Sequence, residues 1–241
     1  MIIIIFMIID SKTKYIIERK REKNMRFPNA FRGVKKIWVA ELLMLLAVVV
    51  GIVLLIVVAA NSTMEGEQVV VNQEAVKTPV AILGISAALI ALIGFILNLV
   101  GLINARKDEA AFKVALFVTG LGIIAAAIGA IWSSNERLNA WMDTLTTIFS
   151  MFASYYILTG IANLADQMPD PATKAVALKS RLLVEGSFCA TAIFKLIINI
   201  FNIQSGSTIH TIMAVVAMVL EILAYLLYLR ALTKGKKMLA K

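Results

Sequence analysis

The chain has 241 residues, of which 60% are hydrophobic and only 16% are charged. Soluble domains carry about 25% charged residues, so this composition indicates a protein that lies in a lipid bilayer. The formal net charge is +9, but the basic residues gather at the ends of apolar segments, which is typical of membrane proteins and not of a nucleic-acid-binding face. The single cysteine, Cys189, and the single histidine, His210, exclude an intrachain disulfide and any metal site built from several such residues.

The first 24 residues differ from the rest of the chain. Residues 1–9 are almost all apolar, but a membrane span needs about 20 such residues. Six basic residues follow this apolar run, whereas a signal peptide carries its basic residues before the run. We interpret residues 1–24 as an extension that is disordered or lies on the membrane surface, or as residues upstream of a true start at Met25. After Met25, aromatic residues at helical spacing predict a short amphipathic segment that leads into the first span. Residues 1–36 together form a basic N-terminal region.

Six apolar segments follow, and each is long enough to cross a bilayer as a helix. They lie at residues 37–60, 80–103, 112–132, 142–165, 181–203 and 208–229. We therefore predict an all-α, polytopic integral membrane protein, with a six-transmembrane-helix bundle over residues 37–232 and a basic tail at 233–241. Residues 61–79 are predicted to form the longest loop. Asp170-Pro171 predicts an N-cap followed by proline at the first helical position.

The basic residues orient this bundle. Of the 24 Lys and Arg residues, 21 lie in the N-terminal region, the connections at 104–113 and 166–181, and the C-terminal segment from Arg230 onward. The opposite connections hold only Lys77 and Arg137. This asymmetry predicts that both termini lie in the cytoplasm and that the chain resides in the cytoplasmic (cell) membrane.

Some polar residues in the spans are predicted to have local partners. Asn98 is expected to form a hydrogen bond to a neighbouring helix, and Glu41 to reach the interface or the nearby lysines. Glu185 is expected to pair with Arg181 or Arg230. Small residues four positions apart in the first three spans permit close helix packing. These pairs are Ala47/Gly51, Gly84/Ala88, Gly122/Ala126 and Ala125/Gly129.

Polar side chains follow one face of each of the last three predicted spans. They are Asp143, Thr147, Ser150 and Ser154 on the fourth span, Ser187, Thr191, Lys195, Asn199 and Asn202 on the fifth, and His210, Glu221, Tyr225 and Tyr228 on the sixth. Polar groups that face lipid lack hydrogen-bond partners, so we expect all three stripes to face the interior of the bundle.

Lys195 and Glu221 are predicted to form an ion pair. Measured from a turn near Ser205, Lys195 is ten residues away and Glu221 sixteen, a difference in depth of about 9 Å. Helical side chains lean toward the N-terminus of their helix, so these two side chains lean toward each other. Such a pair either binds a ligand or couples to protons, or it only holds two helices in register. The sequence leaves both interpretations open.

These features favour a small permease or a solute-binding membrane subunit, in which a solute or a proton breaks the Lys195–Glu221 pair. The candidate ligand-binding or coupling residues are Lys195, Glu221, Asn199, Thr191 and Tyr225. The alternative is a non-transporting scaffold or assembly subunit, whose polar stripes bind other membrane-protein subunits. No phosphate-binding, zinc-protease or serine-hydrolase motif occurs. We therefore expect neither an enzyme nor a cofactor or metal.

Overall fold

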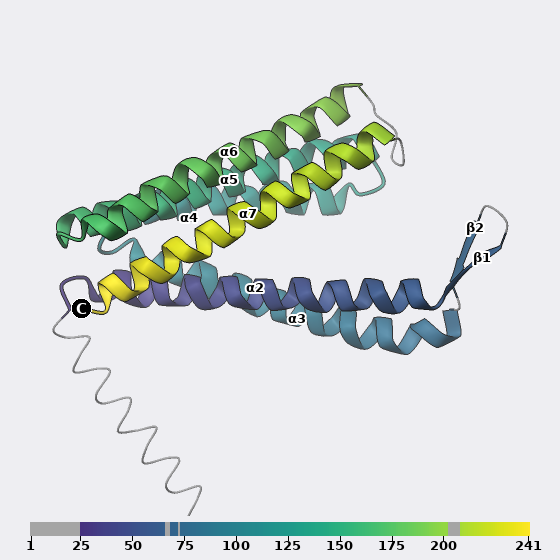
Figure 1. Ribbon diagram of the computed structural model, residues 1–241, viewed down its shortest axis with the longest axis horizontal. Coiled ribbons are helices and arrows are strands. Elements are labelled where there is room, and N and C mark those ends of the chain that lie inside the picture. The colour runs from purple at the N-terminus through teal and green to yellow at the C-terminus, as the bar shows by residue number, and fades with distance from the viewer. Residues whose placement is uncertain (1–24, 66–67, 72, 202–207) are drawn as a thin grey trace, which may run out of the picture.

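The computed structural model describes residues 25–65, 68–71, 73–201 and 208–241. In these ranges the chain forms six helices and one short β-hairpin (Figure 1). The elements are α2 (Pro28–Ala60), β1 (Ser62–Glu65), β2 (Gln68–Val71), α3 (Gln73–Ala105), α4 (Ala111–Ile131), α5 (Glu136–Gln167), α6 (Pro171–Phe201) and α7 (Thr208–Leu239). The predicted helical fold is confirmed, and the extension at residues 1–24 lies outside the described residues.

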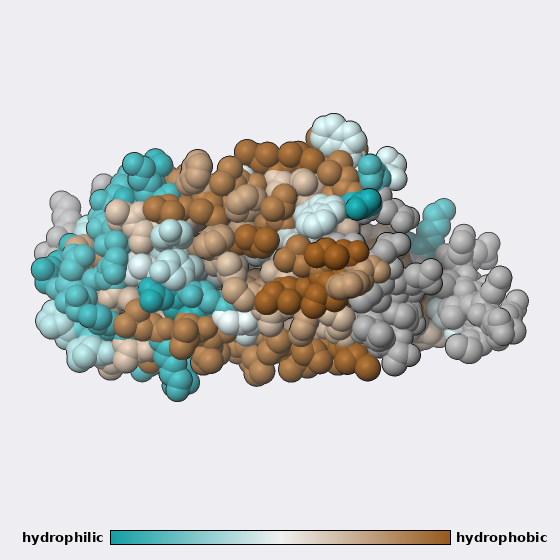
Figure 2. Space-filling view, turned by 90° about the horizontal axis from the view of Figure 1, so that it is seen from above, coloured by the Kyte–Doolittle hydropathy of each residue, from teal (hydrophilic) through white to brown (hydrophobic). Residues whose placement is uncertain are grey.

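Five of these helices are long and apolar enough to cross a membrane, which is compatible with a multi-pass membrane protein. They are α2, α3, α4, α5 and α7. In the view of Figure 2, apolar residues cover the middle of the molecule and hydrophilic residues gather at one end. The fifth predicted span corresponds to α6, which is not among the five in the described part of the chain.

The predicted loop at residues 61–79 is wrong, because most of this segment is regular structure. Strands β1 and β2 pair antiparallel, with Ser62 opposite Val71 and Glu65 opposite Gln68. Three consecutive valines at 69–71 favour an extended strand, since β-branched side chains fit a pleated backbone. Helix α3 then begins at Gln73 and includes Pro79, well before the predicted start of the second span.

The helices form two groups that meet at one end of the molecule (Figure 1). Helices α2 and α3 pair as a hairpin, α4 to α7 form the second group, and α7 crosses back to α2 near its C-terminus. The two groups diverge toward the end that carries β1 and β2. The core of fully buried large side chains includes Val34, Ile37, Leu102, Phe112, Leu158, Ile161, Leu164, Leu232 and Met238. This core ties both groups together at the convergent end.

Two glycines allow α2 and α3 to cross closely within this core. A Cβ atom added to Gly33 would lie 2.5 Å from the carbonyl oxygen of Gly101, which is too close for any side chain. The predicted packing at Gly51 and Gly84 is wrong, since nothing lies within 4 Å of an added Cβ at either position. A small residue marks a close approach only where its face of the helix meets a neighbour.

Polar contacts also hold the convergent end. The carboxylate of Asp108 accepts hydrogen bonds from the backbone N–H of Ala30, at 2.7 Å, and from Asn29 in the first turn of α2. The indole N–H of Trp38 donates to the hydroxyl of Thr233 on α7 at 3.0 Å. The ammonium of Lys236 lies 3.1 Å from the centroid of the Trp38 ring, a favourable cation–π contact. These contacts hold the N-terminal part of α2 against both the α3–α4 connection and α7.

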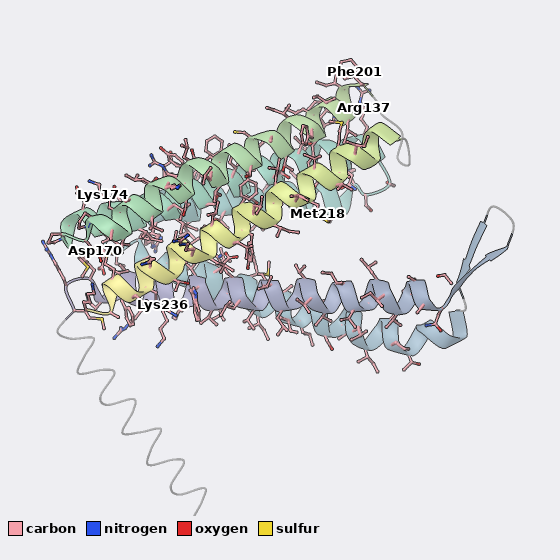
Figure 3. The ribbon with its side chains drawn as sticks, in the orientation of Figure 1. Arg137, Asp170, Lys174, Phe201, Met218 and Lys236 are labelled. Carbon is pink, nitrogen blue, oxygen red and sulfur yellow. The ribbon has the colours of Figure 1, made fainter. Side chains whose placement is uncertain are left out.

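The predicted start of α6 is confirmed. Pro171 is the first residue of the helix, and the carboxylate of Asp170 accepts a hydrogen bond from the backbone N–H of Thr173 at 2.9 Å. This hydrogen bond, together with the ammonium of Lys241 at 3.7 Å, lowers the pKa of the Asp170 carboxyl. Figure 3 shows Asp170 and Lys174 at the convergent end of the molecule.

Candidate functional site

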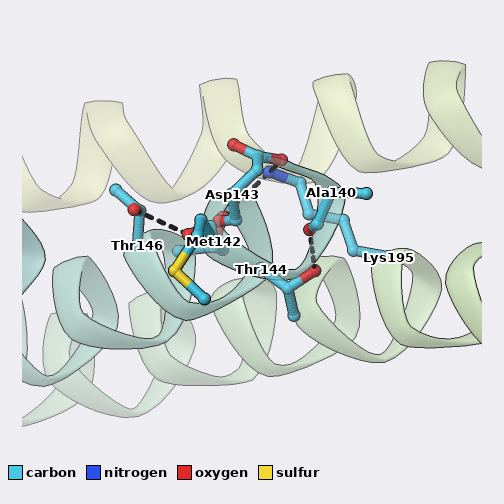
Figure 4. Close-up of polar contacts among 7 residues, drawn as sticks. Ala140, Met142, Asp143, Thr144, Thr146 and Lys195 are labelled. Carbon is cyan, nitrogen blue, oxygen red and sulfur yellow. Dashed lines mark hydrogen bonds and ion pairs between the residues drawn. The ribbon is translucent and has the colours of Figure 1, made fainter. Parts of the chain in front are cut away.

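Lys195 on α6 binds α5 and not α7. Its Nζ atom lies 2.7 Å from Oδ2 of Asp143 and 2.9 Å from the hydroxyl of Thr147 (Figure 4 shows the contact to Asp143). The predicted Lys195–Glu221 ion pair is therefore wrong. The reason is the level of each residue in the bundle: Asp143 is near the start of α5 and Lys195 near the end of the antiparallel α6, whereas Glu221 lies deeper along α7.

Lys195 and Glu221 nevertheless line one cavity, which has a volume of about 390 Å³ and lies among α5, α6 and α7. We call it the smaller cavity. Its polar lining residues are Asp143, Thr144, Thr191, Lys195 and Glu221, and its apolar walls include Phe194, Ile198, Met213 and Ala217. Each of the three predicted polar stripes thus contributes to this cavity, through Asp143 on α5, Thr191 and Lys195 on α6, and Glu221 on α7. Of these stripes, Asn202 and the side chain of His210 lie outside the described part of the structure.

Thr191 is a fully buried polar residue of the smaller cavity. Its side chain is 1% exposed, and its hydroxyl has no hydrogen-bond partner among the described residues. A buried hydroxyl without a partner costs about 1–3 kcal/mol, and such groups in native proteins usually meet water or a ligand. A cavity beside this hydroxyl provides the room for one.

Glu221 is an unpaired acid on the opposite wall. In the described part of the chain, its carboxylate forms no hydrogen bond or ion pair. It lines the smaller cavity and also a second cavity, so it faces both. An acid on a membrane-spanning helix is costly unless a cation, a proton or water accompanies it.

The second cavity, which we call the larger cavity, has a volume of about 530 Å³. It lies between the α2–α3 hairpin and the group α4 to α7. Its charged lining residues are Glu41 and Glu221, and its aromatic lining residues are Phe95, Phe149, Phe188, Tyr225 and Tyr228. Cavities of this size hold small organic molecules.

Glu41 sits in the larger cavity with two polar partners. The side-chain N–H of Asn98 donates to its Oε1 at 3.1 Å, so the predicted interhelical hydrogen bond of Asn98 is confirmed. The phenol of Tyr225 donates to the backbone carbonyl of Glu41, which joins α7 to α2. Glu41 was predicted to reach the interface or the lysines, and it binds Asn98 instead. It is the one charged residue of the first predicted span and Asn98 the one asparagine of the second, a signal that could have paired them.

Of the five residues proposed from the sequence, the fold brings Lys195, Glu221 and Thr191 to the smaller cavity. Tyr225 lies in the larger cavity instead. The side chain of Asn199 lies outside the described part of the structure.

Glu185 belongs to a separate cluster on α6. Its Oε1 lies 3.8 Å from Nε of Arg181, as predicted for one of its two candidate partners. The guanidinium of Arg181 also donates to the hydroxyl of Thr159 at 3.1 Å and stacks 4.8 Å from the ring centroid of Tyr155. These contacts join α5 to α6 and lie outside both cavities.

Comparisons with known proteins leave the family open. The chain matches no protein-family model, no curated protein and, by its structure, no solved structure. Among the described residues, no group of three or more His, Cys, Asp and Glu side chains is placed to hold a metal ion.

Proposed function

We propose that this chain is a small permease or solute-binding membrane subunit that binds a small polar solute in the smaller cavity. The observation that carries the proposal is the buried hydroxyl of Thr191, which has no partner and lies beside the Lys195–Asp143 ion pair. A scaffold whose polar stripe bound another protein would be expected to seal this stripe or turn it to the surface. A cavity within one protomer favours the solute.

The chemistry of the smaller cavity supports a solute that both donates and accepts hydrogen bonds. The free carboxylate of Glu221 accepts, the hydroxyl of Thr191 does both, and the ammonium of Lys195 donates. The solute competes with Asp143 for Lys195, so that binding breaks an existing ion pair. A proton that neutralises either acid would have a related effect. No catalytic reaction is assigned to these residues.

We also propose that the chain crosses the membrane six times, with both termini in the cytoplasm. Five helices meet the requirement for a span, and α6 is proposed as the remaining one, because it packs along α5 and α7. Figure 3 shows Asp170, Lys174 and Lys236 at one end and Arg137 and Phe201 at the other. The excess of basic residues at the first end supports a cytoplasmic location for it.

Cysteine labelling tests this topology. The variants Ser133→Cys and Ala172→Cys place thiols at exposed positions on opposite ends of the molecule, and both are made in a Cys189→Ala background. In sealed cells, a membrane-impermeant maleimide is expected to label the thiol at position 133 only. The thiol at 172 should react after the membrane is opened. Labelling of both thiols from one side would overturn the topology.

Water access to the smaller cavity is tested in the same background. Ala217 lines this cavity, whereas Ile222, on the same helix, is 52% exposed and lines neither cavity. We expect Ala217→Cys to react with a small polar methanethiosulfonate reagent and Ile222→Cys, which faces lipid, to react far more slowly. Equal slow reaction at both positions would contradict a hydrated solute site.

A thermal-unfolding screen on the purified protein then identifies the solute. Amines, amino acids, carboxylates and sugars are tested, since a ligand present at 100 times its dissociation constant stabilises by about 2.7 kcal/mol. The hit is expected to lose its effect in Glu221→Gln, which keeps the shape of the side chain and removes its charge. A hit that stabilises the variant equally would not bind in this cavity.

A scaffold remains the second candidate, because the divergent halves of α2 and α3 expose large apolar side chains. Leu55, Ile56, Ile82 and Ile85 are each at least 60% exposed. A second membrane protein seated between the two helix groups would cover this region. In that case Ile82→Cys is expected to cross-link to the partner in native membranes and to lose this cross-link after detergent separates the two proteins.

A further inference from the structure

The charged residues that line the larger cavity, among those described, are both acidic. Two carboxylates line it, from Glu41 on α2 and Glu221 on α7, and none of the described residues that line it is Lys, Arg or His. Asn98 donates one hydrogen bond to Glu41, and Glu221 has no partner in the described part of the chain. The cavity therefore holds two carboxyl groups and, among its described lining residues, no protein cation to balance their ionised forms.

The walls of the larger cavity suit an apolar cation. Five aromatic residues line it, at positions 95, 149, 188, 225 and 228, and the faces of such rings attract positive charge. Aliphatic residues such as Met44 and Ile123 complete the lining. A carboxylate in such surroundings is screened less than in water, so its attraction for a cation is stronger. A hydrated inorganic ion would gain nothing from the apolar walls.

The larger cavity reaches the apolar surface of the protein, where we place its entrance. Met44 on α2 and Ile123 on α4 line the cavity and are themselves 38% and 37% exposed. They lie on the two helix groups that diverge from the convergent end in Figure 1. Since this surface belongs to helices that are long and apolar enough to span a membrane, the entrance opens toward lipid.

We infer that the larger cavity binds a hydrophobic organic cation that enters from the bilayer, with Glu41 and Glu221 as its counter-ions. The cationic centre lies between the two carboxylates, and the apolar body packs against the aromatic side chains. This site is distinct from the solute site around Thr191, although Glu221 borders both. A neutral lipid chain in the same cavity is the competing occupant, and the experiment separates the two.

A pair of probes with the same shape and opposite charge tests this inference. The protein is placed in phosphatidylcholine nanodiscs, and binding of tetraphenylphosphonium and of tetraphenylborate is measured by equilibrium dialysis against empty nanodiscs. We expect saturable binding of the phosphonium cation and binding of the borate that is about tenfold weaker or more, because two carboxylates face the probe. Equal binding of both probes, or tighter binding of the borate, would show a cavity that selects for apolar shape alone.

Charge-removing variants locate the bound cation. Glu41→Gln and Glu221→Gln are each expected to weaken phosphonium binding by about tenfold or more while leaving borate binding no weaker. Asp166→Asn is the matched control, since Asp166 is exposed, pairs with Lys174 and lies outside both cavities. A misfolded variant would lose both probes, so selective loss of the cation identifies the site. Equal losses in the control and in Glu41→Gln would overturn the inference.

The solute site in the smaller cavity and the cation site in the larger cavity can be disproved independently of each other. Loss of the phosphonium result would leave the labelling of Ala217→Cys unaffected, because Ala217 lines only the smaller cavity. Failure of that labelling would likewise leave the charge preference of the larger cavity in place.

Discussion

The ammonium of Lys195 lies 2.7 Å from the carboxylate of Asp143, a residue 52 positions earlier in the chain. This contact joins α6 to α5 and leaves Glu221, on α7, without an ionic partner in the described residues. The charges on the α5 and α6 side of the smaller cavity are therefore paired, whereas the carboxylate on the α7 side is not paired within the described residues. That asymmetry supports the proposed binding of a solute at this site.

A double-mutant cycle on Lys195 should identify its partner. We expect Lys195→Met and Asp143→Asn to be coupled by about 1 kcal/mol or less, because the side chain of Asp143 is 62% exposed and that of Lys195 is 32% exposed. Lys195→Met and Glu221→Gln should be additive. The free energy of unfolding of each variant, measured by steric trapping in bicelles, gives both coupling energies. Stronger coupling in the Glu221 cycle would restore the pair expected from the sequence.

The crossing of α2 and α3 should tolerate no side chain at Gly33. An added Cβ would lie 2.5 Å from the carbonyl oxygen of Gly101, so Gly33→Ala is expected to destabilise the protein by about 1–3 kcal/mol. Gly51→Ala, on the same helix, is the control, since nothing lies within 4 Å of its added Cβ. It should be neutral or slightly stabilising because alanine favours helix. Thermal unfolding compares the two, and equal effects would contradict the close crossing.

The N-cap at Asp170 should make the free energy of unfolding depend on pH in the acidic range. The hydrogen bond from Thr173 and the nearby Lys241 lower the pKa of Asp170 in the folded protein. Its ionised form therefore stabilises the fold above the ordinary carboxyl pKa of about 3.9, and this contribution is lost as pH falls through the lowered pKa. Asp170→Ala should cost about 1 kcal/mol at pH 7, with a difference from wild type that shrinks at lower pH.

The control for this pH effect is Asp170→Ser, which retains an N-cap acceptor without the charge. Its stability should exceed that of Asp170→Ala at pH 7 and lack the acid-dependent loss contributed by the carboxylate. Unfolding free energies between pH 7 and pH 3 provide the comparison. A difference between wild type and Asp170→Ala that grows on acidification would contradict the lowered pKa.

Removal of the Thr191 hydroxyl should not harm the empty protein. Thr191→Val keeps the shape of the side chain and removes a buried hydroxyl without a partner, so we expect a stabilisation of up to about 1–3 kcal/mol. Thr144→Val is the control, because the hydroxyl of Thr144 is also buried but donates to the carbonyl of Ala140 at 3.0 Å. That change should be neutral or destabilising. A destabilised Thr191→Val would indicate that water already satisfies the hydroxyl.

The helices and their polar faces were predictable because both are local properties of the chain. Apolar length predicted the helices that could span a membrane, and helical spacing placed Thr191 and Lys195 on one face of α6. The partner of Lys195 was not predictable from its own hairpin. Counting residues from the turn compares depths only for the two helices that this turn joins, α6 and α7. Asp143 reaches Lys195 from a third helix, α5, to which that count does not apply.

The sequence by itself determined the helical fold, the apolar surface and the N-cap at Asp170, since each depends on residues within a few turns of one another. Only the tertiary structure decided which helices approach and where they separate. Tyr225 meets the backbone of Glu41 across 184 positions, and the larger cavity lies between the two helix groups. The physical reason is that packing at the convergent end, including the Gly33–Gly101 crossing, sets the direction of every helix that leaves it.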